Sequence, residues 1–160
     1  MKKRTQIILA VLAAILVFCL WYTRPRSFEE LAGDGNMISV SVTAQISGVE
    51  KGKPYINIWT VNSQEDRNHV NTGIEEILKS CKYRVSLRSL FPFPSAYDIP
   101  GKGDILIHIA AVMEDGSSFF GIYKGATATL EFNKIVVVQA ADKDISEKLL
   151  AYTQEFGWEN

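Results

Sequence analysis

The residues able to carry out acid–base, nucleophilic or metal chemistry are few and widely spaced. The chain has two histidines, His69 and His108, and two cysteines, Cys19 and Cys81. It has no CxxC pair, and the histidines lack i,i+4 spacing, so the usual zinc-ligand patterns are missing. His69 and Cys81 would lie about 18 Å apart along one helix, too far for a nucleophile and its base. We therefore predict no metal, no cofactor and no catalytic residue. The pattern argues against an enzyme but leaves that question open.

His108 and Cys81 each allow two interpretations. His108 alternates with two isoleucines in an apolar run, which favours a satisfied or solvent-edge histidine over a ligand or an acid–base group. Cys81 ends an apolar helical stripe, which favours a buried structural thiol. An encounter between the two is geometrically open, but no sequence feature argues for it.

A cluster of basic residues is the strongest candidate binding feature. Residues 27–160 carry 12 Lys and Arg against 18 Asp and Glu, so this cluster is a local exception in an acidic region. Either it is a solvated sheet face, with a lysine favoured at a helix C-terminus, or it contacts an anion. Candidate anions are lipid headgroups, a cell-wall polymer and an acidic partner surface. The residues are Lys79, Lys82, Arg84 and Arg88.

The segment LFPFPSAYDIPGKGD, residues 90–104, is the second candidate. Pro92 and Pro94 exclude helical geometry for the residues before them and cannot donate to a sheet ladder. The GKGD run has no following Ser or Thr and precedes a strand, so a turn is favoured over a phosphate loop. The aromatic side chains either cover the end of the core or form a displayed binding surface; they are Phe91, Phe93 and Tyr97.

The first 26 residues predict where these groups are located. Residues 1–4 are basic, residues 5–23 contain no charge, and two arginines follow. About 20 apolar residues cross a hydrocarbon core of roughly 30 Å, so we expect a transmembrane anchor at 5–23. The larger basic count before it places residues 1–4 in the cytoplasm and the rest outside, with Trp21 and Tyr22 at the outer interface. A cleaved signal peptide and a lipoprotein are weaker alternatives, because small residues are missing at the required positions.

The remaining chain predicts one α+β domain. We expect a tether at 24–36 and an extracytoplasmic domain at 37–160, with a mainly antiparallel sheet of about seven strands and two amphipathic helices on one face. No intramolecular disulfide can form there, because Cys81 is its single cysteine. Alternation of apolar and polar residues predicts strands, and 3.6-residue periodicity predicts helices. The strands are expected at 37–47, 55–62, 83–90, 104–113, 118–123, 127–132 and 135–140, and the helices at 67–81 and 144–156.

Two local features refine the helices. Gly73 in the interior of the first helix costs roughly 1 kcal/mol relative to alanine, so its first turns are expected to be loose. Asp144 with Glu147 three residues later predicts a capping box at the start of the second helix.

Several runs resemble a group of small exported proteins of Gram-positive bacteria that carry one N-terminal anchor and a domain of unknown function. These runs are ILKSCKYRVSLRSL, GKGDILIHI, DGSSFF, NKIVVV and LLAYTQEFG, which lie between about residues 75 and 157. The resemblance rests on structural rather than chemical motifs. It implies an anchored domain and no particular activity.

The sequence favours a membrane-anchored extracytoplasmic domain that acts by binding. Expected partners are the lipid bilayer through residues 5–23 and another envelope protein or an anionic surface. Nucleic acid is not expected, because the exported part is acidic. The alternatives are a sensor domain for a small ligand and, less favoured, a hydrolase whose site is assembled from distant residues.

Overall fold

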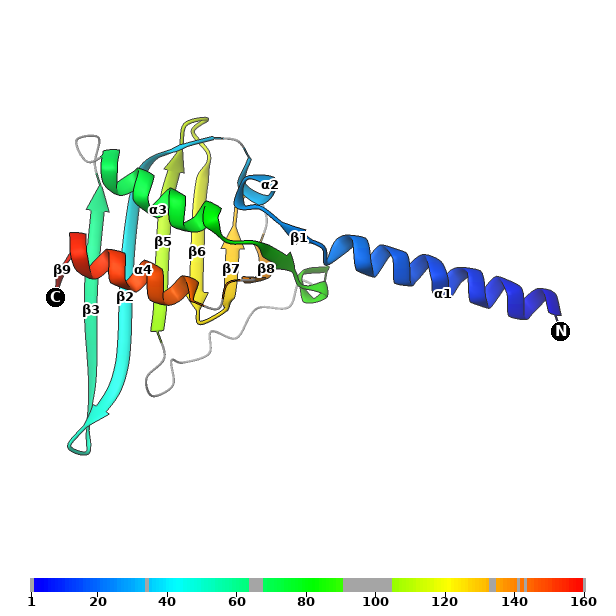
Figure 1. Ribbon diagram of the computed structural model, residues 1–160, viewed down its shortest axis with the longest axis horizontal. Coiled ribbons are helices and arrows are strands. Elements are labelled where there is room, and N and C mark those ends of the chain that lie inside the picture. Colours follow the sequence, from blue (N-terminus) through cyan, green and yellow to red (C-terminus); the bar gives the residue numbers. More distant parts are fainter. Residues whose placement is uncertain are drawn as a thin grey trace.

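The computed structural model describes residues 2–33, 35–63, 68–90, 105–132, 135–140, 142 and 144–159. A long helix, α1, projects from one end of a large sheet, and helices α3 and α4 cross one face of that sheet (Figure 1). The α+β architecture predicted from the sequence is confirmed.

Helix α1 spans Lys2–Tyr22 and is apolar on all sides. Its 21 residues measure about 31 Å at 1.5 Å per residue, which matches the hydrocarbon core of a bilayer. None of its most apolar 18-residue stretch is buried against the rest of the chain. Thr23 ends the helix, since its backbone N–H and its hydroxyl both donate to the Cys19 carbonyl, at 3.0 and 2.8 Å.

The described strands form one sheet in the order β1-β4-β8-β7-β6-β5-β2-β3-β9, with every neighbouring pair antiparallel. Strands β1 and β9 have two residues each, so seven longer strands make up most of the sheet, as the alternation predicts. The bounds are β1 Pro25–Arg26, β2 Met37–Glu50, β3 Lys53–Ser63, β4 Tyr83–Val85, β5 Ile105–Met113, β6 Ser118–Lys124, β7 Thr127–Glu131, β8 Ile135–Ala140 and β9 Trp158–Glu159.

The core lies between one face of the sheet and the two covering helices. Val42, Ile107 and Ile109 of the central strands are fully buried on that face. Helix α3, Asn68–Ser80, and helix α4, Ile145–Phe156, bury one stripe each against it. This is the arrangement expected when strands of period two and helices of period 3.6 share a single apolar layer.

The segment after the anchor differs from the expectation. Residues 24–36 were predicted to be a tether, but β1 and helix α2, Phe28–Ala32, lie within them. Phe28 is only 1% exposed, so the segment belongs to the folded domain. Ser27 and Glu30 form a reciprocal capping box at 2.8 and 3.2 Å, which explains why so short a helix forms.

The strand predicted at 83–90 is also shorter than expected. It ends at Val85, and a 3₁₀ helix, η2, spans Leu87–Leu90. The two leucines are three residues apart, which is the 3₁₀ period, and local alternation does not distinguish the two geometries.

The capping box predicted at the start of α4 is wrong, and Gly73 of α3 has a packing role that its helix propensity does not indicate. Asp144 makes no side-chain capping bond; instead the Asp142 carboxylate accepts from the Asp144 N–H at 3.0 Å. Gly73 lies where the ring of Tyr152 packs across α3, and a Cβ at Gly73 would overlap that ring. The Tyr152 hydroxyl donates to the His69 carbonyl at 3.2 Å, so glycine permits a close contact between α3 and α4.

Candidate functional site

The junction between α1 and the sheet is short and well connected. Only Thr23 and Arg24 separate the end of α1 from β1. The Arg26 guanidinium lies 5.9 Å from the ring centroids of both Trp21 and Tyr22, and it donates to the Tyr22 carbonyl at 3.4 Å. These contacts hold the last turn of α1 against the edge of the sheet.

Helix α2 fastens the same junction to the core. The Phe28 ring packs edge-to-face on Phe119 of β6 at 5.3 Å and lies 6.2 Å from the Tyr83 ring of β4. Phe132, which follows β7, contributes a third ring at 6.0 Å. Since β1 also pairs with β4, α1 is connected to the domain through both backbone and side chains.

The predicted basic cluster divides into two parts. Lys79 forms ion pairs with Glu75 at 2.6 Å and Glu29 at 3.3 Å, and its hydrogen bond to Glu75 is the main cause of its raised pKa. It therefore links α3 to α2 rather than offering a free charge. Arg84 is exposed on β4, and Lys82 is exposed directly before the strand. The side chain of Arg88, and the whole of Phe91, Phe93 and Tyr97, lie outside the described residues.

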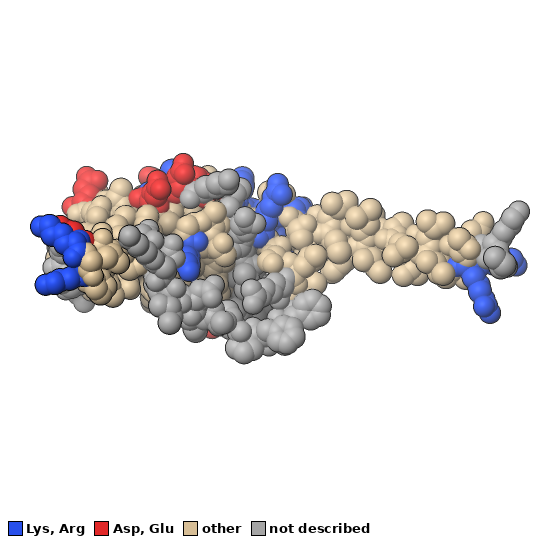
Figure 2. Space-filling view, turned by 90° about the horizontal axis from the view of Figure 1, so that it is seen from below, with Lys and Arg blue, Asp and Glu red and all other residues tan. Residues whose placement is uncertain are grey.

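The two parts lie next to different elements. Arg84 is directly opposite Pro25 in the antiparallel pairing of β4 with β1, so it lies beside the residues that follow α1. In Figure 2, acidic side chains gather along one side of the domain. Lys and Arg gather mainly at the junction with α1, at the free end of α1 and at the opposite end of the domain. The sequence alone places Arg84 with Lys79, whereas the structure places it with Arg24 and Arg26.

His108 lies on the face of the sheet that the helices do not cover. Its neighbours across the ladders are Thr43 of β2 and Ile122 of β6, and the Phe120 ring lies 6.4 Å away. None of these offers a carboxylate to orient the imidazole. Partial burial lowers the pKa of His108, which favours the neutral ring.

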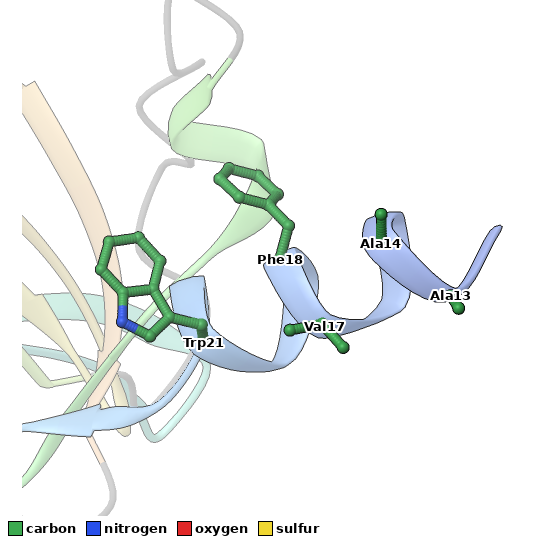
Figure 3. A pocket seen from close by; sticks show the side chains of 5 residues that line it. All are labelled: Ala13, Ala14, Val17, Phe18 and Trp21. Atoms are coloured by element: carbon green, nitrogen blue, oxygen red, sulfur yellow. The ribbon is translucent and has the colours of Figure 1, made fainter. Parts of the chain in front are cut away.

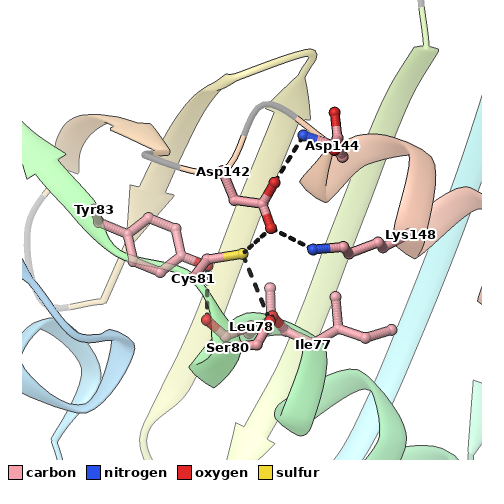
Figure 4. A network of polar contacts seen from close by, with 8 residues as sticks. All are labelled: Ile77, Leu78, Ser80, Cys81, Tyr83, Asp142, Asp144 and Lys148. Carbon is pink, nitrogen blue, oxygen red and sulfur yellow. Dashed lines mark hydrogen bonds and ion pairs between the residues drawn. The ribbon is translucent and has the colours of Figure 1, made fainter.

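Cys81 lies on the other side, in the core beneath the helices, so the two side chains do not meet. The interpretation of Cys81 as a buried thiol is confirmed, with an exposed fraction of 1%. Its Sγ donates to the Asp142 carboxylate at 3.7 Å, and that carboxylate is also ion-paired with Lys148 (Figure 4). Burial is the main cause of the raised pKa of Cys81, so the thiol stays protonated. This network joins the end of α3 to the start of α4.

The Gly- and Lys-bearing turn at 48–54 predicts a hairpin between 37–47 and 55–62, and the pairing of β2 with β3 confirms it; what the sequence reasoning missed is how far this hairpin projects. Among the residues that the structure describes, β2 pairs with β5 only from Met37 to Ile46, and the last part of the hairpin extends beyond the other strands (Figure 1). Val49, Tyr55 and Ile56 are 44%, 41% and 57% exposed there. The turn residues Lys51 and Gly52 both have positive φ, 51° and 79°, as a two-residue hairpin turn requires. Apolar residues on both sides of a Lys-Gly pair were the available signal.

The remaining features concern metals and grooves. The structure was searched for clusters of metal-binding side chains. Among the residues that it describes, no group of three or more His, Cys, Asp or Glu is placed to hold a metal ion. An open apolar groove runs along α1; its lining residues are Ala13, Ala14, Val17, Phe18 and Trp21 (Figure 3). Comparison with protein-family models, curated proteins and solved structures finds no match to this chain.

Proposed function

We propose that this chain is a single-pass membrane protein whose extracytoplasmic domain binds another protein of the cell envelope through the projecting β2–β3 hairpin. The observation that carries the proposal is a domain attached closely to an apolar helix at one end and presenting an apolar, unpaired strand edge at the other.

The membrane part of the proposal rests on α1. The helix is long enough to cross a bilayer, carries no charge after Arg4, and has no buried residue in its most apolar 18-residue stretch. Lys2, Lys3 and Arg4 precede it and two arginines follow, a bias that favours a cytoplasmic N-terminus. The domain that begins at β1 would then lie outside the cytoplasm.

The binding part rests on the free edge of β3. Within the described residues, β9 covers β3 only at Trp59 and Thr60, so residues 53–58 have no strand on their outer side. Glu50 and Lys53 flank the two-residue turn and therefore pair inward, which by alternation points the backbone N–H groups of Ile56 and Ile58 outward. Such an edge accepts an added strand from a partner.

The side chains along this edge indicate the chemistry of the partner segment. Ile56 is exposed and Ile58 partly exposed on one face of the hairpin, while Lys51 and Lys53 are exposed at its turn. We infer an extended partner segment with alternating apolar residues and an acidic residue near one end. Pro54 has no N–H, which restricts the register in which such a segment pairs.

In-cell photocrosslinking tests this proposal. A photoreactive residue at Lys53 should give one defined adduct, and the same residue at Ala151, exposed on α4, should not. Ile56→Pro removes an outward N–H without removing a hairpin hydrogen bond, so it should abolish the Lys53 adduct while the melting temperature stays close to that of the parent.

Two results would contradict the proposal. One is an adduct that persists in Ile56→Pro; the other is an identical set of adducts from Lys53 and Ala151. The absence of any adduct, together with stabilisation by one small molecule in a thermal-shift screen, would favour the sensor alternative instead.

A further inference from the structure

We propose that Arg24, Arg26 and Arg84, here called the arginine collar, bind the phosphate groups of anionic lipids in the membrane that holds α1. This inference rests on the anchoring proposed above and adds a specific lipid contact to it. It concerns the end of the domain opposite to the hairpin.

The position of the collar along the chain determines how deep it would lie in the membrane. Trp21 and Tyr22 end α1, and amphipathic rings at the end of a membrane helix lie at headgroup level. Arg24 and Arg26 follow within four residues of Tyr22, and Arg84 is opposite Pro25 in the next strand. Paired residues in a ladder lie on the same face of the sheet. Arg26 pairs with Tyr83 and Pro25 with Arg84, so Arg26 and Arg84 lie on opposite faces of the sheet at its β1–β4 edge.

The Arg26 guanidinium is held but incompletely bonded. It packs over Trp21 and Tyr22 at 5.9 Å and makes one hydrogen bond, to the Tyr22 carbonyl. Its Nε is buried without a hydrogen-bond partner in the described part of the chain. Stacking on aromatic rings holds the planar guanidinium, a group whose fork of N–H donors suits bidentate binding of phosphate.

The carboxylates near the collar are already engaged. Glu29 is paired with Lys79 at 3.3 Å, and Glu30 accepts from the Ser27 N–H at 2.8 Å. Glu30 also lies 3.5 Å from Arg24, an exposed pair that contributes little. Among the described residues, no carboxylate is within ion-pair distance of Arg26 or Arg84, so their charge is left for an external anion.

An apolar pair lies beside these arginines. Figures 1 and 3 both place η2 next to the C-terminal end of α1. Leu87 and Leu90 of η2 are 39% and 45% exposed, and residues three apart on a 3₁₀ helix lie on the same side. Exposed leucines next to arginines and aromatic rings match the mixed apolar and charged character of a membrane interface. These neighbours favour a lipid surface over an acidic protein as the source of the anion.

Fluorescence quenching in vesicles tests the collar with the full-length chain. Trp21 lies at the collar, whereas Trp59 and Trp158 belong to the β3–β9 end of the sheet, away from α1 (Figure 1). Acyl-brominated phosphatidylglycerol is compared with acyl-brominated phosphatidylcholine in mixed vesicles, and the ratio of quenching gives the lipid preference around Trp21. We expect phosphatidylglycerol to be preferred at low salt and the preference to decline as salt is added.

The double variant Arg24→Gln, Arg84→Gln should reduce that preference by about fivefold for each arginine, which corresponds to about 1 kcal/mol per basic side chain near an anionic surface. The matched control is Lys51→Gln, Lys53→Gln, which removes the same charge at the hairpin turn and should leave the preference unchanged. Both arginines are exposed, so the variant is expected to fold.

The outcomes are distinct. Equal quenching by the two lipids, or equal loss in the arginine and lysine variants, would refute the collar while leaving the anchor intact. Absence of quenching by either lipid would refute the anchor itself, and the collar with it.

Discussion

Replacement of Phe28 by alanine tests whether the segment after the anchor is part of the folded domain. Phe28 is 1% exposed, and its ring contacts come from β4, β6 and the residue after β7. If residues 24–36 were a tether, this substitution would be a surface change worth less than about 0.5 kcal/mol. The structure instead predicts the loss of a core aromatic residue.

The magnitude follows from the burial. A fully buried Phe→Ala substitution lowers the free energy of unfolding by about 3–5 kcal/mol, because it loses the transfer free energy of the ring and leaves a cavity. For a domain of this size, each kcal/mol shifts the melting temperature by about 3–5 °C. We therefore expect Phe28→Ala to lower the melting temperature of the domain by about 10–25 °C.

Circular dichroism melts of the full-length chain in detergent measure this shift. The matched control is Phe120→Ala on β6, where the ring is 38% exposed on the face that the helices leave open. That control removes the same side chain with no closed cavity, so its effect should be several-fold smaller. A Phe28→Ala melting temperature within 2 °C of the parent, or equal to that of Phe120→Ala, would show that the tether interpretation was right.

Two further predictions concern α3 and the open face. Gly73→Ala should destabilise the domain in urea denaturation although alanine gains about 1 kcal/mol of helix propensity, because its Cβ overlaps Tyr152; in a Tyr152→Ala background the same change should become stabilising. Stabilisation by Gly73→Ala in the parent would contradict the packing described here. The pKa of His108 is lowered by burial, so its contribution to stability is present above about pH 6.5 and is lost as the pH falls through the folded-state pKa. His108→Gln should make the free energy of unfolding less dependent on pH in this range. An NMR titration giving a His108 pKa above 6.5 would refute the prediction.

The elements of the domain were largely predictable because burial on one side leaves a period in the sequence. Alternating residues at 37–47 and 118–123 become β2 and β6, and the helical stripes at 67–81 and 144–156 become α3 and α4. The pairing order was harder, since β2 lies between β3, its neighbour in sequence, and β5, more than 50 residues later. Which distant strands become neighbours depends on how all the apolar side chains pack into one layer. No local sequence pattern encodes that pairing.

The candidate sites show the same division. Sequence spacing grouped Lys79 with Arg84, but two carboxylates on α2 and α3 pair with Lys79. Arg84 joins Arg24 and Arg26, about 60 residues away, through the β1–β4 ladder. The capping box at Ser27 and Glu30 was visible as an S-x-x-E pattern, and it was the available warning that the supposed tether is structured.

The sequence by itself determined the apolar helix, the acidic character of residues 27–160, the presence of one cysteine there and the α+β class, because each follows from composition or from a short period. Only the tertiary structure decided that Phe28 belongs to the core, that Gly73 admits Tyr152, that Arg84 lies opposite Pro25, and that the β2–β3 hairpin extends past its neighbours. Those features depend on contacts between residues far apart in the chain. Such contacts form when the whole domain packs, and the conformational preference of one segment does not determine them.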